Sequence, residues 1–380
     1  MAKRRISAMD MVVGQPLPWN AYNAAGRLLL HKGEIVADQM QIDRMSAQGL
    51  FSDESDDAGG NVGSAQEKPS AVRMIDQANE LLQRILPPIA NMPLMADDID
   101  ADKKLRAISR LVYEAVKLNA NVSIACIQLN QDTAPYVYRH AVDTAIVSAS
   151  IAHEMHQKEA DIMTLIAAAL TANIGMLDFQ EKLQKRAKLT DEEKHRMQQH
   201  PLDGVEILRN VGIDDEAWLS LVLHHHESED GSGYPNSSKG EDIPLGAKII
   251  GIADRYCARV SNKAYRDEVL PNAALRDILV QHASEISLPL AAHFVKIIGR
   301  YPPGATVRLK NQEIGVVIKN GTKPTTPVVR VTISKAGLPV EDALLRDTEN
   351  PMYAIKEEVP RSLAGASLIM SKFWGDVAAL

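Results

Sequence analysis

Three consecutive histidines stand directly before a turn-forming segment, in the stretch His224–Pro235, which reads HHHESEDGSGYP. Imidazole is the commonest side-chain ligand of transition metals at neutral pH, because one ring nitrogen offers a lone pair without losing a proton. Gly231 and Gly233 can adopt backbone conformations that a Cβ atom forbids, so the chain can turn back tightly over whatever the histidines hold. Pro235 then fixes φ at the exit of the turn. The stretch predicts a metal site, with a solvated histidine-rich helix end as the alternative.

Three further side chains could complete such a site from other parts of the chain. These are His140, His200 and Asp254, which lie in stretches with helical character. Any one of them alone is more often a structural or surface residue than a metal ligand. Their order along the chain and their local sequences favour a shared site with His225 and His226.

Composition indicates a globular protein of a reducing compartment. The 380 residues suffice for two or three domains, and 45% hydrophobic with 24% charged residues is ordinary for a soluble fold. A formal net charge of −7 argues against a broad nucleic-acid-binding face. The two cysteines, Cys126 and Cys257, match neither a disulfide framework nor a paired-cysteine zinc site. The first residues lack the apolar core of a signal peptide, so we expect a cytoplasmic protein with no DNA, RNA or membrane partner.

The first 70 residues predict a small module followed by a linker. Residues 1–51 have the pattern of an α+β module, with a hairpin at residues 27–36 and an amphipathic helix at residues 38–49. Residues 52–70 are acidic, rich in glycine and serine, and nearly free of large apolar side chains. This composition predicts a flexible linker.

The fold class is predicted to be mainly α. Apolar side chains recur at helical spacing from Val72 onward, and an aspartate at position 98, 100 or 102 is the expected cap of a second helix. Residues 162–177 form the most apolar run, which is too short for a membrane span and predicts a buried core helix. After residue 300 the runs 305–309, 314–318 and 328–333 are β-rich. We therefore expect a helical domain at 71–300 with its core at about 120–300, a β-rich domain at 301–360 and a weakly helical tail at 361–380.

Three segments together resemble the HD-GYP family, the branch of the HD metal phosphohydrolases linked to bacterial cyclic di-GMP signalling. They are HPLDG at residues 200–204, the stretch from His225 to Pro235, and the stretch from Ile243 to Tyr256. A chance match to all three would be rare. The resemblance covers about residues 120–300 and implies an HD-type helical bundle, and the β-rich stretch to about residue 359 is similar to a tail that many members carry.

The resemblance also implies roles for individual residues. The family's metal ligands fall on His140, His200, His225, His226 and Asp254. Its loop tyrosine falls on Tyr234, and the two cations of its phosphate-contacting R-x-x-[KR] element fall on Lys263 and Arg266. A lysine keeps the charge of the usual arginine at the first of these positions but loses the planar fork that suits phosphate.

The chain departs from the family at the motif that names it. Members have L-H-D-I-G-K or a close variant where this chain reads LTANIGM, so Ala172 replaces histidine, Asn173 replaces the metal-bridging aspartate and Met176 replaces lysine. An alanine offers no ligand, and the neutral amide oxygen of asparagine is a poor bridge between two dications. The histidines at 200, 225 and 226 would still suffice for one divalent metal, with iron or manganese expected.

Two classes of function follow from the resemblance. Phosphodiester hydrolysis in the family is expected to need two metals, which activate water and stabilise charge on the phosphate. We therefore expect a degenerate signalling protein that binds cyclic di-GMP, or a protein partner such as a diguanylate cyclase domain, without efficient hydrolysis. The alternative is a phosphodiesterase of low activity, rescued by a mononuclear site or a shifted ligand. His153 and His156 are conceivable shifted ligands, although a solvated helix face is the preferred interpretation, and a homodimer is left open.

Overall fold

The structure is a computed structural model, and it describes residues 3–5, 17, 20–23, 28–31, 33–35, 42, 45, 51–53, 68–91, 100–131, 133–183, 188–261, 269–365 and 368–380. The chain divides into two compact units, Met1–Glu67 and Lys68–Leu380. Each unit has its own cluster of buried apolar side chains, so each is described by itself.

The first unit contains a small antiparallel sheet in the strand order β1-β4-β2-β3. Its strands are β1 (Lys3–Arg5), β2 (Ala21–Tyr22), β3 (Leu28–Leu30) and β4 (Phe51–Asp53). Strand β3 lies inside the expected hairpin at residues 27–36, and its described partner is β2. Strand β4 continues two residues into the expected linker, because Ser52 and Asp53 pair with β1.

The expected helix at residues 38–49 is described at two positions only. Ile42 and Met45 are helical there and are buried with Leu17 and Ala21 in the core of the first unit. The three-residue spacing places both side chains on one helix face, as the amphipathic pattern requires. The other positions of this helix lie outside the described residues.

Limited proteolysis is expected to cut the chain first within residues 52–70. The composition of this stretch offers too little apolar surface to offset the entropy of ordering it. The stable product should begin near Ala71, where α2 starts, and should keep the C-terminus. Mass spectrometry of a protease time course would measure this, and a first cut inside residues 301–360 would contradict the proposed domain boundaries.

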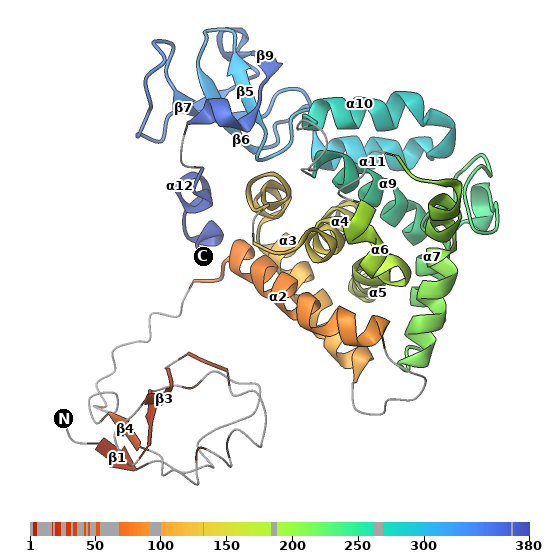
Figure 1. The fold of residues 1–380 in the computed structure, drawn as a ribbon. Coiled ribbons are helices and arrows are strands. Elements are labelled where there is room, and N and C mark those ends of the chain that lie inside the picture. The colour runs from red at the N-terminus through yellow and green to blue at the C-terminus, as the bar shows by residue number, and fades with distance from the viewer. Residues whose placement is uncertain are drawn as a thin grey trace. The chain divides into compact units, whose positions relative to one another are not determined.

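The second unit is built mainly of α-helices (Figure 1). Several begin at side chains that cap the free backbone N–H groups: Asp100, one of the three expected caps, accepts from the Lys103 amide at 3.1 Å, and Asp215 accepts from the Trp218 amide at 3.1 Å. The helices are α2 (Ala71–Ala90), α3 (Ala101–Leu129), α4 (Tyr136–Glu154), α5 (Glu159–Thr171), α6 (Leu177–Leu183), α7 (Asp191–Asn210), α8 (Glu216–His224), α9 (Leu245–Val260), α10 (Pro271–Gln281), α11 (Leu288–Ile298) and α12 (Met370–Trp374).

Helices α4 and α5 lie at the centre of the core and pack against each other. The stretch Glu159–Gln180 is long and apolar enough to cross a membrane by length and composition alone, yet 83% of its most apolar window is buried inside the protein. The prediction that residues 162–177 are buried in the core is confirmed. The helix is not continuous, however, because α5 ends at Thr171 and a short 3-10 helix, η3 (Ile174–Met176), leads into α6.

A five-stranded antiparallel sheet follows the helices, in the order β8-β7-β6-β5-β9. The three expected β-rich runs form β5 (Thr306–Leu309), β6 (Ile314–Lys319) and β7 (Val328–Ile333). Val307, Leu309, Val317 and Val329 point into a small core of their own. The edge strands β8 (Leu345–Asp347) and β9 (Ile355–Glu358) were not expected, because both are short and carry charged side chains.

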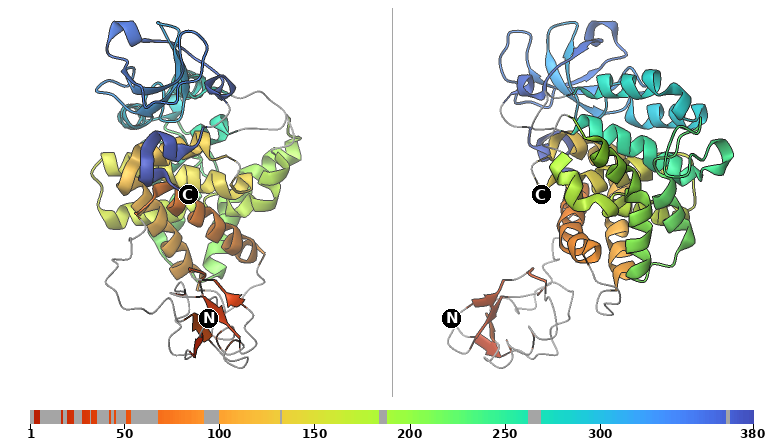
Figure 2. Two further views of the ribbon diagram at one scale, coloured as in Figure 1. Left: turned by 90° about the vertical axis from the view of Figure 1, so that its left-hand side faces the viewer. Right: turned by 45° about the vertical axis from the view of Figure 1, so that its right-hand side comes forward.

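The C-terminal tail docks on the helical domain, which its weak helical pattern did not predict. After α12 and a 3-10 helix, η8 (Gly375–Ala378), the chain ends beside the start of α2 (Figure 2). Ser70 Oγ donates to the Ala379 carbonyl oxygen, and Trp374 Nε1 donates to the Ile318 carbonyl oxygen at 2.8 Å. Met370 is buried in the helical core. The tail therefore joins α2 to the β-rich domain.

Candidate functional site

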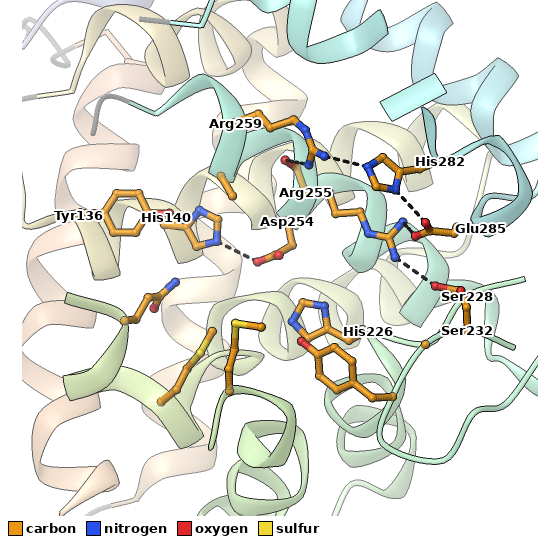
Figure 3. A pocket seen from close by; sticks show the side chains of 16 residues that line it. Tyr136, His140, His226, Ser228, Ser232, Asp254, Arg255, Arg259, His282 and Glu285 are labelled. Atoms are coloured by element: carbon orange, nitrogen blue, oxygen red, sulfur yellow. Dashed lines mark hydrogen bonds and ion pairs between the residues drawn. The ribbon is translucent and has the colours of Figure 1, made fainter. Parts of the chain in front are cut away.

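A cavity of about 520 Å³ opens among α4, η3, α6, α7, α9 and the loop after α8 (Figure 3). Most of the sequence-predicted site residues that the structure describes lie at or directly beside it. The cavity is lined by His140, His226, Tyr234 and Asp254, among others. Its wall is largely polar, with three histidines, two arginines and two carboxylates beside a few apolar side chains, and a volume of some hundreds of cubic ångströms is typical of small-molecule sites.

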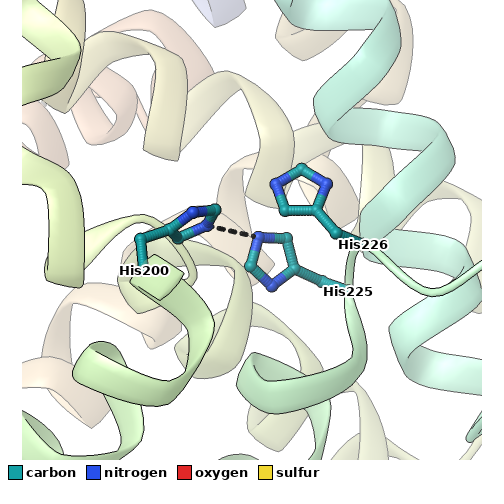
Figure 4. A group of neighbouring side chains, drawn as sticks. All are labelled: His200, His225 and His226. Carbon is teal, nitrogen blue, oxygen red and sulfur yellow. Dashed lines mark hydrogen bonds between the residues drawn. The ribbon is translucent and has the colours of Figure 1, made fainter. Parts of the chain in front are cut away.

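His200, His225 and His226 form a compact cluster (Figure 4), with one ligand atom of each within 4.8 Å of the others. The Nδ1 atoms of His200 and His225 face the backbone carbonyl oxygens of Met197 and Val222, which only accept, so both Nδ1 atoms carry the proton. Their Nε2 atoms then face each other at 3.2 Å with bare lone pairs. Two such lone pairs repel unless a cation is bound, so the cluster fits one metal ion.

Burial keeps the three imidazoles of this cluster neutral. Loss of hydration is the main cause that lowers the pKa of His200, to about 3, and it also lowers the pKa of His225 and, more strongly, of His226. Neighbouring imidazoles lower the pKa of His200 and His226 further. A neutral imidazole is the form that binds a metal, so the cluster needs no proton release at neutral pH.

Two glycines allow the backbone to close around these histidines. A Cβ atom at Gly233 would lie 2.5 Å from the carbonyl oxygen of His226, and one at Gly251 would lie 2.5 Å from the carbonyl oxygen of His225. Any side chain at either position would therefore push the loop or α9 away from the cluster. Gly231 has φ +79°, so the tight turn expected after the histidines is present.

His140 and Asn173 both bind one oxygen of Asp254. His140 Nε2 donates to Asp254 Oδ1 at 2.8 Å, and Asn173 Nδ2 donates to the same oxygen at 3.0 Å. Burial alone would raise the pKa of Asp254, but the charge and hydrogen bond of His140 hold it well below its usual range. The three side chains therefore form a closed hydrogen-bonded triad around an ionised carboxylate.

A second metal does not fit at this triad. In this structure the Nε2 atom of His140 takes part in a hydrogen bond to Asp254. Asn173 turns its N–H group toward the carboxylate, and its Oδ1 atom is buried without a hydrogen-bond partner in the described part of the chain. Ala172 is fully buried in the hydrophobic core and has no ligand atom. The donor set present at these positions matches hydrogen bonding better than coordination of a dication.

The remaining sequence-predicted residues lie in different places. Tyr234 lines the cavity with its ring stacked on His226 at a centroid distance of 4.8 Å, and burial raises its pKa, so its hydroxyl keeps its proton. Met176, the replacement for the motif lysine, also lines the cavity.

His153 and His156 are exposed and do not line the cavity, which agrees with a solvated helix face and not with shifted ligands. Lys263 and Arg266 lie outside the described residues.

Sequence reasoning missed two arginines in the cavity wall. Arg255 and Arg259 are four residues apart on α9 and so share a face. Arg255 donates to Ser228 Oγ at 3.2 Å and pairs with Glu285 at 2.8 Å, and Arg259 donates to His282 Nε2 at 3.0 Å (Figure 3). The four-residue spacing of the two arginines directly after Asp254 was the available signal, but their partners His282 and Glu285 on the segment before α11 could not be placed from the sequence.

Comparisons with known proteins find sequence similarity over the helical domain that holds this site. Residues 125–286 match the HD domain family. The chain is 29% identical to a cyclic di-GMP phosphodiesterase of Pseudomonas aeruginosa over 57% of this chain and 52% of that protein. It is 34% identical to a cyclic di-GMP phosphodiesterase response regulator of Xanthomonas campestris pv. campestris over 36% of each. The chain thus spans about half or less of the length of these two relatives.

Among solved structures, the chain is similar to an HDG"Y"P protein from Bdellovibrio bacteriovorus. The TM-score is 0.48 at 14% sequence identity, and the alignment covers 77% of this chain and 97% of that one. The HD domain of a Listeria monocytogenes phosphodiesterase in complex with cyclic di-AMP aligns over 45% of this chain and 92% of that chain, with 16% identity and a TM-score of 0.32.

Proposed function

We propose, on the premise that residues 125–286 form an HD domain of the HD-GYP type, that this chain is a one-metal signalling protein. It binds a cyclic dinucleotide, with cyclic di-GMP as the first candidate, and does not hydrolyse it efficiently. The relatives are named for cyclic di-GMP or 3'3'-cGAMP phosphodiesterase activity, which supports this class of ligand. The cytoplasm is the proposed location.

The observation that carries the proposal is the double hydrogen bond on Asp254. Where the family motif has a histidine and a metal-bridging aspartate, this chain has Ala172 and an Asn173 amide that donates to Asp254. The residue at the position of the bridging aspartate therefore donates a hydrogen bond to Asp254. It supplies neither a negative charge nor a ligand atom to a second metal ion. Removing one electrostatic group from an active site costs roughly 10²–10³ in rate, and losing a whole metal should cost more.

Binding of a cyclic dinucleotide requires fewer groups than its hydrolysis, and the cavity contains groups that could bind phosphate and base. A metal at His200, His225 and His226 would supply a positive charge for a phosphate oxygen. Arg255 lines the same cavity, and its guanidinium suits phosphate recognition. Tyr234 offers a ring or a hydroxyl to a nucleotide. We further propose, from the family resemblance, that Lys263 and Arg266 contact phosphate.

Two other functions are alternatives that the experiment below can distinguish from the main proposal. A phosphodiesterase of low activity is favoured by the names of the relatives and by the three-histidine cluster. A protein partner, such as a diguanylate cyclase domain, is the proposal that remains if no cyclic dinucleotide binds. Both are separated from the main proposal by measuring metal content, ligand binding and turnover on one preparation.

Full-length protein purified with iron or manganese supplied is expected to hold one tight metal per chain. Because the three-histidine cluster is the proposed site, His200→Ala should abolish tight binding, whereas His140→Ala should leave it largely in place. Elemental analysis would count the metal, calorimetry would measure cyclic di-GMP binding, and chromatography would follow its hydrolysis. Circular dichroism of both variants would verify that they fold.

Two tightly held metals per chain would contradict the one-metal proposal. Turnover at a rate ordinary for an enzyme, roughly 1 per second or faster, would favour the phosphodiesterase. Binding without turnover is the expected result.

A further inference from the structure

The cavity wall contains a buried amide oxygen that has no hydrogen-bond partner among the described residues. Gln180, in α6, is 6% exposed and lines the cavity, and its side-chain oxygen Oε1 is buried without a hydrogen-bond partner among the described residues. A carbonyl oxygen that loses water and gains no donor is costly, so such groups are rare in folded proteins. A ligand that brings a donor into the cavity would remove this cost.

The surroundings of Gln180 suit a flat, largely apolar group. Met176 from η3, Met197 from α7 and Tyr136 from α4 line the same cavity. Thioether side chains are flexible and polarisable, and they make favourable contacts with aromatic rings. An amide among apolar side chains is a common arrangement for reading a nucleobase, because the base is apolar on its faces and has donors and acceptors on its edge.

The cavity wall thus combines charged groups with apolar side chains and one amide. Figure 3 shows Tyr136 and His140 on one side of Asp254, and Arg255, His282 and Glu285 on the other. Arginine suits the phosphate of a nucleotide, and an apolar region with one amide suits its base. A nucleotide bound across Asp254 would satisfy both.

We propose that Gln180 is a base-binding residue that contacts the edge of a purine base, and that this base is guanine when cyclic di-GMP is bound. The inference rests on the proposed function, which supplies the cyclic di-GMP. The carbonyl oxygen of Gln180 accepts from guanine N1–H, and its amide N–H donates to guanine O6. Adenine also offers a donor beside an acceptor, so the amide can bind either purine. A carboxylate at position 180 would distinguish the two bases, because it accepts hydrogen bonds and donates none.

Calorimetry of the full-length protein with manganese supplied tests the inference, with cyclic di-GMP and cyclic di-AMP as ligands. Gln180→Met keeps the length of the side chain and removes both hydrogen-bonding groups, so affinity for cyclic di-GMP should fall about tenfold. Gln180→Glu keeps an acceptor for guanine N1–H and its amino group but cannot donate to adenine N1. It should keep cyclic di-GMP binding within about threefold of wild type and weaken any cyclic di-AMP binding by about tenfold.

Gln128→Met is the matched control, because Gln128 is also a buried glutamine and does not line this cavity. Its affinity for cyclic di-GMP should equal that of the wild type. Wild-type affinity in Gln180→Met would overturn the role of Gln180 and leave the proposed function standing. A wild-type protein that binds cyclic di-AMP and not cyclic di-GMP would overturn the guanine assignment, and one that binds neither would overturn the proposed function together with this inference.

Discussion

The double change Ala172→His and Asn173→Asp is expected to create a second tight metal site and measurable hydrolysis of cyclic di-GMP. It restores the two side chains that the HD-GYP motif has at these positions. The new carboxylate would stand where Asn173 Nδ2 now lies, 3.0 Å from Asp254 Oδ1, so two charged carboxylates could share a metal. We expect two metals per chain by elemental analysis and an increase in turnover of at least about 10²–10³.

The same change should make the metal-free protein less stable. A hydrogen-bond donor to Asp254 is replaced by a like charge in a buried site, and an uncompensated buried charge costs on the order of 3 kcal/mol. Urea unfolding with a chelator should show this loss in the free energy of unfolding, and added manganese should recover it. The wild-type protein should gain stability only from the metal at the three-histidine cluster, so the additional metal-dependent gain of the double variant measures the second site.

Two controls separate the metal from the fold in this experiment. Asn173→Asp alone supplies the carboxylate without the histidine and should show the metal-dependent stability with little turnover. His200→Ala added to the double change should abolish the gained activity, because it removes a ligand of the first metal. A double variant that holds two metals and still lacks turnover would show that the replaced motif does not by itself explain the absence of hydrolysis.

Of the predicted metal ligands, His200, His225 and His226 lie together in the structure, and their local sequence patterns are short-range. His225 is the C-cap of α8 and His226 follows it, and the glycines after them allow the turn that brings Tyr234 back over His226. His200 lies on a helix with a clear capping box at Thr190. Patterns of this kind depend on neighbours within a few residues, which a sequence displays directly.

Contacts between segments far apart in the chain could not be predicted from the sequence. The amide of Asn173 was expected to be a poor metal ligand, but its hydrogen bond to Asp254 joins positions 81 residues apart. Arg255 is fixed by Glu285, and the tail is fixed by Trp374 on β6 and by Ala379 on Ser70. Periodicity shows which face of a helix is apolar, and it does not show which remote polar group that helix meets.

Gly175→Ala is expected to destabilise the protein strongly and to weaken its metal binding. Gly175 is the glycine of the degenerate motif and lies in η3, and η3 packs on α7, the helix that carries His200. A Cβ atom at Gly175 would lie 2.3 Å from the His200 carbonyl oxygen and 2.7 Å from the Gly204 backbone nitrogen. Both contacts are with backbone, which cannot turn aside as a flexible side chain would, so η3 and α7 must separate. The free energy of unfolding should fall by about 3 kcal/mol in urea titrations.

Gly204→Ala is the matched control for this change, because Gly204 lies on the opposite side of the same contact. A Cβ atom there would meet Ile174, Val222 and the Gly175 nitrogen at 3.5–3.7 Å, which is ordinary van der Waals contact. An alanine inside α7 should leave stability unchanged or raise it by up to about 1 kcal/mol, since glycine loses more backbone entropy on folding. Equal losses in both variants would contradict the close backbone approach. A loss confined to Gly175→Ala, in stability and in metal content together, would show that the motif's glycine still positions His200 although the motif's ligands are gone.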